Sequence, residues 1–335
     1  MSDTETQQLK AGIIGCGSIS EVHAGVLSKM KKAALTVLCD TDEAKAKARR
    51  DMHPECDIKI YTDWKELIDS DVDVFHICTP HYLHAPMAAE LLKAGKAVFL
   101  EKPCAISEEQ FEVLKAADRE HPGKLGICFQ NRYNETTEIA DRVIKEGKIG
   151  NVIGARGFVT WKRDEDYYTK DPWKGYMETS GGGALINQSI HTLDLVLRYL
   201  GEPVSVKASL SNHHLPGWIE VEDTVDAVME FKGGARACFY ASNGYSCDAP
   251  VIIEIQGDKG RLTINANTVL LNTESGDELL TTKGLPGFVK DYWGRGHQAC
   301  IEDFYDCLIT GREFPVNLAS AENSFKTMME IYSFR

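Results

Sequence analysis

Short apolar runs recur along the first 130 residues of this 335-residue chain, and stretches with the period of an amphipathic helix separate them. The runs predict buried strands at 9–14, 34–39, 58–61, 74–77, 97–100 and 125–129. The stretches between them predict helices at 19–30, 42–51, 63–69, 84–94 and 107–119, with start signals such as Asp63 and the capping box of Ser107 and Gln110. Strands that alternate with helices pair in parallel through right-handed crossovers, so this part is expected to form a doubly wound sheet.

The pattern changes after a helix predicted at 136–146. Runs typical of a mostly antiparallel sheet follow at 151–160, 203–210, 224–231, 235–242, 251–257 and 261–266, with helices at 184–200, 296–310 and 318–333. The predicted fold class is therefore α/β, with an N-terminal domain at 1–130 around the parallel sheet and a C-terminal domain at 131–335 around an open, mostly antiparallel sheet. A ligand is expected in a cleft between the two domains, because such clefts commonly bind ligands.

Charge and composition exclude several classes of partner. The formal net charge is −13, with 37 basic and 50 acidic side chains spread along the chain, which argues against nucleic acid and anionic membranes as partners. The start, MSDTETQQLK, is polar, and there is no apolar run near the ~20 residues that a membrane span needs, so export is not expected. The ten cysteines are scattered without a C-x-x-C pair, which indicates reduced thiols and a cytoplasmic location.

The first predicted strand runs directly into a glycine turn, GCGSIS at 15–20, and then into a helix. Such a turn lets a pyrophosphate approach the helix N-terminus, where free amide groups favour an anion. Ser20 stands at the third glycine position of the G-x-G-x-x-G/A pattern, from which it departs, although it is small enough for close helix packing. The second strand ends at Asp40, whose carboxylate suits ribose hydroxyls and repels a 2′-phosphate, although it could instead cap the next helix. Together these features predict NAD as the cofactor, with NADP less favoured.

Polar side chains collect where two further strands are predicted to end. Lys102 follows the run at 97–100, and the segment CTPHYLH, 78–84, follows the run at 74–77. In open α/β sheets, ligands bind beyond the carboxyl ends of the strands. We therefore expect Lys102 to reach a ligand rather than to lie on an exposed loop.

A second glycine segment, 181–183, precedes the helix predicted at 184–200 and allows another backbone to approach the start of that helix. On this helix Asn187, His191 and Asp194 are spaced by four and three residues and so share one face, opposite an apolar one. A polar face on a helix that is otherwise core-like indicates the lining of a site. For a lone histidine such as His191, a core residue with satisfied hydrogen bonds is the commoner explanation.

These segments together resemble the Gfo/Idh/MocA family, named for glucose-fructose oxidoreductase and inositol dehydrogenase. The matching pieces span nearly the whole chain in the expected order: GCGSIS, Asp40, CTPHYLH, EKP at 101–103, FQNRYN at 129–134 and GGGALINQSIHTLDL from 181. The resemblance implies a Rossmann-like N-terminal domain that binds NAD(P) and a C-terminal domain for substrate binding and oligomerisation. It also implies oxidation or reduction of a sugar or polyol carbon by a nicotinamide cofactor.

The resemblance assigns roles to residues as well. Lys102 and His191 carry over as catalytic residues. The residues expected to bind the cofactor are Gly15, Gly17, Ser18, Ile19, Asp40, Thr79, Pro80, His84, Glu101 and Lys102. Those expected to bind the substrate are Asn131, Arg132, Tyr133, Trp173, Asn187 and His191, and no residue is expected to bind a metal ion.

The sequence departs from the family pattern at one important position. Many members have an aspartate where this chain has Asn187, and an amide cannot accept the substrate proton. The expected base is therefore His191, since a histidine with an ordinary pKa near ~6.5 accepts a proton at neutral pH. Lys102 would stabilise the charge on the substrate oxygen, Asp194 would orient the imidazole, and Asn187 would bind a substrate hydroxyl.

The aromatic stretch from Trp161 to Tyr176 favours a pyranose or glycoside as substrate, because aromatic faces stack on the C–H faces of sugars. A structural loop that packs its aromatic side chains on the domain explains the stretch nearly as well. Arg132, Arg163 and Lys174 could hold an acidic substituent such as a uronate.

Three other functions stay open at this stage. One is an NAD-assisted glycosidase or eliminase that oxidises its substrate only transiently, and another is a non-catalytic sugar or NAD sensor. The third is a metal enzyme that uses His81 and His84. In each case a homodimer or homotetramer is expected, because an open apolar sheet face needs a cover.

Overall fold

The computed structural model describes residues 8–265, 267–281 and 296–335. Contacts divide the chain into two compact units: the first comprises Met1–Cys128 and His297–Ser320, and the second comprises Phe129–Gly296 and Ala321–Arg335. These units are defined by contacts and are not the two domains of the sequence analysis, so the domain boundary at residue 130 stays a prediction. In the first unit, a segment from near the C-terminus packs with the N-terminal part of the chain.

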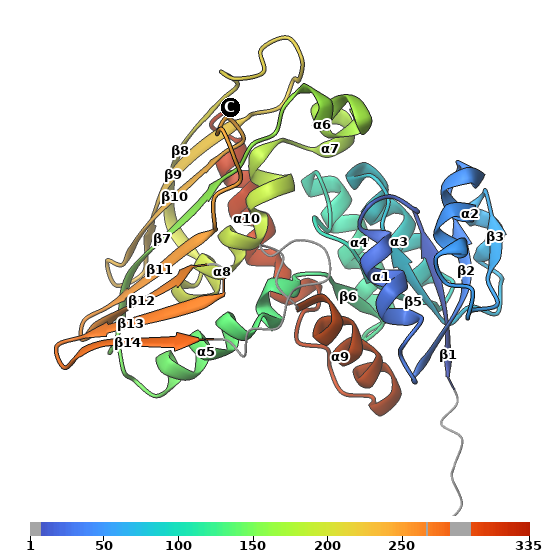
Figure 1. Ribbon diagram of the computed structural model, residues 1–335, viewed down its shortest axis with the longest axis horizontal. Coiled ribbons are helices and arrows are strands. Elements are labelled where there is room, and N and C mark those ends of the chain that lie inside the picture. The colour runs from blue at the N-terminus through green and yellow to red at the C-terminus, as the bar shows by residue number, and fades with distance from the viewer. Residues whose placement is uncertain (1–7, 266, 282–295) are drawn as a thin grey trace, which may run out of the picture. The chain divides into compact units, whose positions relative to one another are not determined.

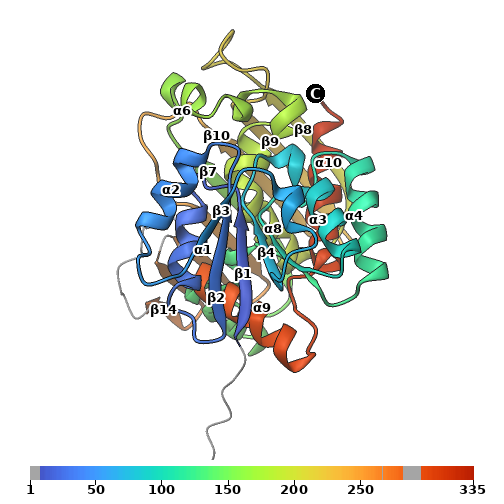
Figure 2. The same ribbon diagram turned by 90° about the vertical axis from the view of Figure 1, so that its right-hand side faces the viewer.

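The first unit is built on a sheet of six parallel strands, in the order β3-β2-β1-β4-β5-β6, of which β1 to β4 are labelled in Figure 2. The strands are β1 (Leu9–Ile14), β2 (Ala33–Cys39), β3 (Lys59–Tyr61), β4 (Val74–Ile77), β5 (Ala97–Leu100) and β6 (Leu125–Ile127). Strands β4, β5 and β6 are buried along their whole length, as unbroken apolar runs predict for a sheet covered on both faces. The doubly wound parallel sheet is thus confirmed, and the strand order reverses between β1 and β4, where such sheets bind ligands.

Helices cover this sheet (Figure 2). They are α1 (Ser20–Leu27), α2 (Glu43–Asp51), α3 (His84–Lys93), α4 (Glu108–Glu120) and α9 (Gly296–Thr310). The start signal of α4 is confirmed, because the Ser107 side chain accepts a hydrogen bond from Gln110 N. The α-helix predicted at 63–69 is wrong in kind: Trp64–Leu67 form a single 3-10 turn capped by Asp63, too short to propagate as an α-helix.

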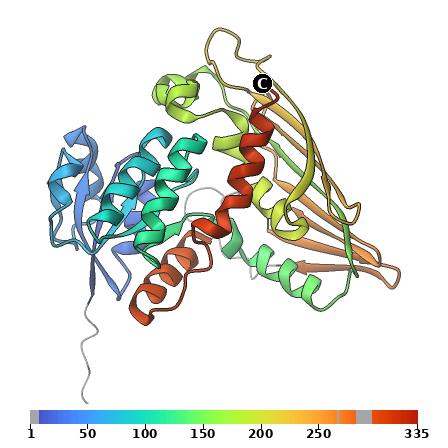
Figure 3. The ribbon, with the colours of Figure 1, turned by 180° about the vertical axis from the view of Figure 1, so that it is seen from behind.

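The second unit holds a sheet of eight strands, in the order β14-β13-β12-β11-β7-β10-β9-β8 (Figures 1 and 3). The strands are β7 (Val152–Thr160), β8 (Pro203–Ser211), β9 (Thr224–Phe231), β10 (Arg236–Ser242), β11 (Ile252–Gly257), β12 (Gly260–Asn265), β13 (Thr268–Thr273) and β14 (Gly276–Thr281). Among these strands β7 and β10 alone pair in parallel, so the mostly antiparallel sheet is confirmed. The sequence pattern does not predict β13 and β14, because TVLLNT and GDELLT are short and mix polar with apolar residues.

The helices α5 (Glu135–Lys145), α8 (Ile190–Leu200) and α10 (Leu318–Tyr332) lie on one side of this sheet (Figures 1 and 3). Helix α8 packs on β7 and β11, and α5 packs on β12 and β13. Two short helices follow β7: α6 (Glu165–Lys170) lies in the aromatic stretch, and α7 (Met177–Ser180) directly follows it. The helix predicted at 184–200 is α-helical only from Ile190, because Ala184–Ser189 form a π-helical turn. Such turns often occur at functional sites.

The eight-stranded sheet buries one face and exposes the other. Along β9, Val225, Met229 and Phe231 are buried, whereas the residues next to them in the chain are exposed or half-buried. Apolar side chains are among the exposed ones, and Val204 of β8 exposes 68% of its surface. Cover of this face by a second copy of the chain stays a prediction.

Two expectations from composition concern thiols and membranes. All ten cysteines are free and seven of them are buried, as predicted for reduced core thiols. None of the helices that the structure describes combines the length and the hydropathy that a bilayer crossing requires.

Candidate active site

The glycine turn after β1 combines close packing at one glycine with open space at the next. Gly15 adopts φ +92°, and a Cβ there would lie 2.6 Å from the carbonyl oxygen of Cys78, so only glycine fits. A Cβ on Gly17 would meet no heavy atom within 4 Å, and both Gly17 and Ser18 are exposed. Ser20 begins α1 and donates its hydroxyl to the Gly17 carbonyl at 2.6 Å. The start of α1 is therefore open to solvent at the turn, which a phosphate group requires.

Asp40 is tied to this turn at the end of β2. Its carboxylate accepts hydrogen bonds from Cys16 N at 2.7 Å and from Asp42 N at 2.9 Å. The next helix is capped by Asp42, which accepts a hydrogen bond from Ala44 N, so helix capping does not explain Asp40. A carboxylate held beside an open glycine turn fits the ribose hydroxyls of a dinucleotide and opposes a 2′-phosphate.

Lys102 directly follows β5 and its residue is half-buried. The peptide bond between Lys102 and Pro103 is cis. The neighbouring Glu101 is buried and accepts hydrogen bonds from His23 Nε2 at 2.8 Å and from Lys102 N at 3.3 Å. Burial raises the pKa of the Glu101 carboxyl, but the hydrogen bond from His23 and the electrostatic effects of two further basic side chains hold it well below its usual range. The two are His297 and Lys102.

Two buried histidines that the sequence analysis did not single out extend this contact. The Nδ1 atoms of His23 in α1 and His76 in β4 lie 2.8 Å apart. His76 Nε2 lies 3.1 Å from the hydroxyl of Tyr305 in α9. All three side chains are fully buried. The signal in the sequence is a histidine inside an apolar strand, VFHI, which must find hydrogen-bond partners within the core because an unpaired buried ring is costly.

His23, Glu101 and Cys128 offer donor atoms within 4.8 Å of one another, an arrangement that a metal ion could use. The 2.8 Å separation of His23 Nε2 and Glu101 Oε1 is that of a direct hydrogen bond. Burial raises the pKa of the Cys128 thiol well above its ordinary value, which keeps the sulfur protonated. These contacts describe a hydrogen-bonded cluster rather than a set of metal ligands.

The segment after β4 brings His81 and His84 into the core, where both are buried. His84 Nδ1 lies 2.7 Å from the carbonyl oxygen of Pro103, and Nε2 lies 2.9 Å from that of Thr79. Burial lowers the pKa of His84, while the two carbonyl bonds raise it less. The ring therefore connects the segment after β4 to Pro103, the residue after Lys102. Both ring nitrogens make these contacts, so neither is left to bind a metal ion. Three residues expected at the cofactor are half-buried: Ile19, Thr79 and Pro80.

In the second unit, the glycines at 181–183 are packed against a neighbouring segment. A Cβ on Gly183 would collide with the backbone carbonyl oxygen of Glu222. The Glu222 carboxylate accepts hydrogen bonds from Gly183 N and Leu185 N at 2.9 Å each and from the Tyr332 hydroxyl at 3.0 Å. Burial raises the pKa of Glu222 in spite of these bonds. The prediction that another backbone approaches this helix start is confirmed, and a buried acid occupies it.

His191 lies in the first turn of α8 and is half-buried. Its Nε2 lies 3.3 Å from Nε2 of Gln130, and its ring meets that of Phe129 edge-on with centroids 5.7 Å apart. Both partners come from one segment, FQNRYN, in which the residues after Gln130 were expected to bind substrate. This segment therefore orients the imidazole, a role that its sequence alone does not reveal.

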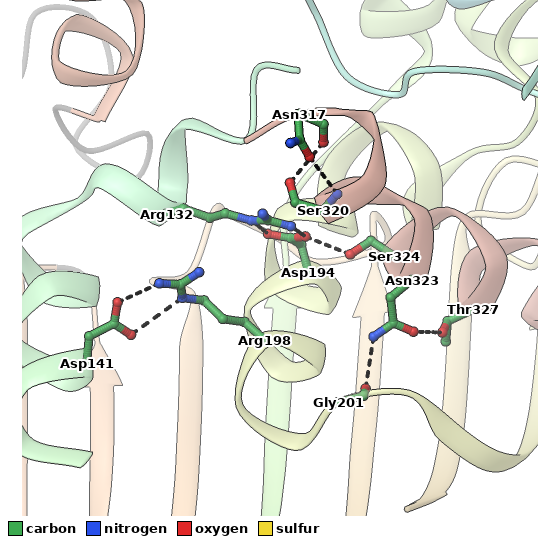
Figure 4. A network of polar contacts seen from close by, with 10 residues as sticks. All are labelled: Arg132, Asp141, Asp194, Arg198, Gly201, Asn317, Ser320, Asn323, Ser324 and Thr327. Atoms are coloured by element: carbon green, nitrogen blue, oxygen red, sulfur yellow. Dashed lines mark hydrogen bonds and ion pairs between the residues drawn. The ribbon is translucent and has the colours of Figure 1, made fainter. Parts of the chain in front are cut away.

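Asp194, one turn after His191, forms a buried ion pair (Figure 4). Its Oδ2 accepts a hydrogen bond from Arg132 Nε at 2.8 Å, and its Oδ1 accepts bonds of 2.6 Å from a terminal nitrogen of Arg132 and from the Ser324 hydroxyl. The expectation that Asp194 orients the imidazole is corrected accordingly. A guanidinium binds both carboxylate oxygens at once, which a single imidazole nitrogen cannot do.

Asn187 lies in the π-helical turn before α8, and Tyr167 of α6 holds its amide. Asn187 Nδ2 and Gln188 Nε2 both donate to the Tyr167 hydroxyl, at 3.3 Å and 3.0 Å. Two cations face the Tyr167 ring: Lys174 Nζ lies 4.2 Å and the guanidinium carbon of Arg163 lies 5.2 Å from its centroid. The aromatic stretch thus packs on the segment that carries Asn187.

The other residues expected to bind substrate are half-buried: Asn131, Arg132, Tyr133 and Trp173. In the part of the chain that the structure describes, no donor reaches Asn131 Oδ1, although this atom is buried. A buried carbonyl oxygen of this kind is costly unless a ligand or water donates to it. The expected site residues thus form two groups, the glycine turn with Asp40 and Lys102 in the first unit and the residues around His191 in the second.

Comparisons with known proteins match both units. Residues 9–129 match a family model described as an oxidoreductase family with an NAD-binding Rossmann fold, and residues 138–263 match a GFO/IDH/MocA C-terminal domain. The chain is 26% identical over 309 residues to inositol 2-dehydrogenase of Rhizobium meliloti, covering 91% of this chain and 90% of that protein. It is also 26% identical over 289 residues to levoglucosan dehydrogenase of Pseudarthrobacter phenanthrenivorans, covering 77% and 74%.

A similar solved structure is that of the WlbA dehydrogenase from Bordetella pertussis in complex with NADH and UDP-GlcNAcA. The TM-score is 0.85 and the identity is 25%, and the match covers 100% of this chain and 96% of that one. Each of these matches extends over at least 74% of both chains.

Proposed function

Because this chain belongs to the Gfo/Idh/MocA family of NAD-binding oxidoreductases, we propose that it transfers a hydride between NAD and a secondary alcohol carbon of a sugar, glycoside or polyol. The names of its relatives support the substrate class, since they include an inositol and a levoglucosan dehydrogenase. The observation that carries the proposal is the open glycine turn with a fixed carboxylate, Asp40, at the end of the next strand. This pairing suits a dinucleotide without a 2′-phosphate.

The cofactor is assigned to residues of the first unit. The turn from Gly15 to Ile19 would receive the pyrophosphate at the start of α1, and Asp40 would bind the adenosine ribose. The nicotinamide end is assigned to the segments after β4 and β5, with Thr79, Pro80, His84, Glu101 and Lys102. When bound, NAD supplies the carbon that accepts the hydride.

The acid–base work is assigned to His191 and Lys102. His191 accepts the proton of the substrate hydroxyl, with its ring held by Gln130 and Phe129. The Lys102 ammonium, which interacts electrostatically with the Glu101 carboxylate, stabilises the negative charge that develops on the substrate oxygen. These roles require only that the ring be neutral and the amine charged near neutral pH.

Substrate recognition is assigned to half-buried polar and aromatic residues of the second unit: Asn131, Arg132, Tyr133, Trp173 and Asn187. The NH₂ group of Asn187 donates to Tyr167, and its carbonyl oxygen is assigned to accept a hydrogen bond from a substrate hydroxyl. The buried Oδ1 of Asn131 is a second acceptor of the same kind. Two acceptors suit a molecule that carries several hydroxyl groups.

The test measures absorbance of reduced nicotinamide when the protein is mixed with NAD, or separately with NADP, and a panel of pyranoses, glycosides, uronates and inositols. Turnover with NAD and one substrate class is the expected result. NAD binding with release of an aglycone but without net reduction would point instead to transient oxidation. NAD binding without any turnover would point to a sensor.

Two variants test the assigned roles. His191→Ala should lower kcat by about 10² to 10⁴ and Lys102→Ala by about 10² to 10³, the ranges for removal of a general base and of an electrostatic stabiliser. The matched controls are His213→Ala and Lys93→Ala, exposed residues of the same types in the same units, which should keep wild-type turnover. Near wild-type turnover of either active-site variant, with NAD bound normally, would show that the role is assigned wrongly.

A further inference from the structure

The first unit contains a continuous line of buried hydrogen bonds that ends at the carboxylate beside Lys102. It joins Glu101 to His23 of α1 at 2.8 Å, His23 to His76 of β4 at 2.8 Å, and His76 to Tyr305 of α9 at 3.1 Å. Three of its four side chains are fully buried, and Glu101 exposes 5% of its surface. Tyr305 lies 229 residues from His76 in the sequence, so a C-terminal helix completes a cluster on the N-terminal sheet.

The order of protons along this line follows from what each atom can donate. The Tyr305 hydroxyl has one polar partner among the described residues, His76 Nε2, and therefore donates to it. His76 then accepts at Nε2, and since burial lowers its pKa well below the ordinary value, its ring is neutral and carries its proton on Nδ1.

The same reasoning continues to the carboxylate. His76 Nδ1 donates to Nδ1 of His23, so the proton of His23 sits on Nε2 and is donated to Glu101 Oε1. Every donor in the line has an acceptor and every ring is neutral. The opposite order of protons is less favourable for two reasons. It would place a positive charge on the fully buried His23. It would also turn the Nε2–H group of His76 toward the Tyr305 oxygen, so that the Tyr305 hydroxyl proton would lack an acceptor among the described residues.

We propose that His76 and Tyr305 act with His23 as a relay of positioning residues, which keeps the Glu101 carboxylate ionised and thereby holds Lys102 as a charged amine. Glu101 needs such support because burial alone favours its protonated form. The relay ends in a buried phenol, Tyr305, so it fixes proton positions rather than conducting protons to solvent. This inference rests on the proposed function only in its last step, the use of Lys102 in catalysis.

Other titratable groups around Glu101 fit this assignment. They include His297 of α9, Lys102, His84 and the thiols of Cys78 and Cys128, of which the Cys128 thiol hydrogen-bonds to Glu101. Burial outweighs the nearby Glu101 carboxylate and lowers the pKa of His297 to about 4, so His297 is neutral at pH 7. Burial also keeps the Cys128 thiol protonated. Lys102 therefore supplies the positive charge that faces the Glu101 carboxylate.

The first test reads the tautomers directly and needs no substrate. In protein labelled with ¹⁵N at histidine, ring nitrogen shifts should show His23 protonated on Nε2 and His76 protonated on Nδ1 near neutral pH. Single substitutions of each histidine assign the signals. His76 protonated on Nε2, or His23 present as an imidazolium, would overturn the relay.

The second test reads Lys102 itself, through the pH dependence of its acylation followed by mass spectrometry. His23→Leu should raise the labelling rate of Lys102 near pH 8 about tenfold, since loss of the Glu101 charge lets the amine lose its proton about one pH unit lower. His76→Leu should raise it about threefold, and Tyr305→Phe less but in the same direction. Labelling of the exposed Lys93 should not change in any variant.

Conservative variants separate the relay from a merely structural role. His23→Gln retains a donor near the Nε2 position, and His76→Asn retains one near the Nδ1 position, so each should raise labelling less than the leucine variant of the same residue. Thermal denaturation checks that each variant is folded. A shift in His23→Leu without any shift in His76→Leu would overturn the relay and leave His23 as a single contact.

The outcome is independent of whether the proposed reaction is correct. The protein could show the expected tautomers and the graded labelling of Lys102 but no turnover. That result would count against the proposed function and leave the relay intact. Wild-type labelling in every variant of an active dehydrogenase would overturn the relay alone.

Discussion

Two glycine-rich turns precede helices in this chain, and the structure gives them opposite surroundings. After β1, Gly17 and Ser18 are exposed, and a Cβ on Gly17 would meet no atom within 4 Å. Before the π-helical turn, Gly183 presses against the backbone of Glu222, whose carboxylate accepts the first amide hydrogens. The first turn leaves a helix start open to a ligand, and the second fills its helix start from within the protein.

The difference shows what a glycine-rich motif by itself does and does not indicate. Glycines permit close approach to a helix N-terminus, but the approaching group can be a cofactor phosphate or a side chain of the same protein. An internal carboxylate such as Glu222 satisfies the same amides that an anionic ligand would use. Openness of the turn, rather than the number of glycines, therefore distinguishes a candidate binding site from a structural contact.

The largest expected effect separates the two turns by stability. Gly183→Ala should lower the free energy of unfolding by roughly 3–5 kcal/mol, because its Cβ meets backbone atoms of Glu222 that cannot move aside as a side chain can. Urea denaturation measures this change.

The matched control is Gly17→Ala, whose Cβ meets open space. Its unfolding free energy should stay within about 0.5 kcal/mol of wild type. Its affinity for NAD should nevertheless fall about tenfold or more, because the backbone must approach the pyrophosphate closely at this turn. If Gly183→Ala and Gly17→Ala lost equal stability, or if Gly17→Ala kept its NAD affinity, the distinction between a filled and an open glycine turn would be wrong.

The next effect compares the two buried glutamates, whose pKa values move in opposite directions from the ordinary 4.5. The pKa of Glu101 is lowered, so its stabilising contribution is present above 4.5 and is lost as the pH falls below that value. The pKa of Glu222 is raised, so its contribution is present below 4.5 and is lost as the pH rises through its folded pKa. A tenfold difference in proton affinity between the folded and unfolded protein corresponds to about 1.4 kcal/mol of stability.

Unfolding free energies measured from about pH 3 to 8 test this pair. Glu101→Gln should flatten the loss of stability on the acid side of 4.5, and Glu222→Gln should flatten the loss above 4.5. Each variant thus serves as the control for the other. If both variants flattened the pH dependence on the same side of pH 4.5, the opposite pKa shifts of the two glutamates would be contradicted.

The smallest expected effect concerns cofactor choice at the open turn. Asp40→Asn should weaken NAD binding and narrow the preference for NAD over NADP by about tenfold, or ~1.4 kcal/mol, because the repulsion of a 2′-phosphate disappears. Calorimetric titration with both cofactors measures the ratio. Asp42→Asn is the control, since asparagine caps a helix as well as aspartate and Asp42 is the cap of α2. A change of preference in the control but not in Asp40→Asn would show that the cap, not Asp40, governs the choice.

Several features of this protein follow from the sequence alone. The pattern of apolar runs and amphipathic stretches predicts the six parallel strands and the five helices around them within a few residues. The glycine turn, Asp40 at the end of β2 and Lys102 after β5 are equally local, because residue order fixes which side chain follows which strand. The family match agrees with motifs that lie in this part of the sequence.

The partners of the polar side chains are decided by the tertiary structure. Asp194 binds Arg132 and Ser324 rather than the nearby His191, and the π-helical turn interrupts a helix that periodicity predicts as continuous. Glu222 fills a helix start 39 residues away in the sequence, and His76 finds Tyr305 at a separation of 229. Secondary structure depends on near neighbours in the chain, whereas buried hydrogen bonds depend on which distant groups packing brings together.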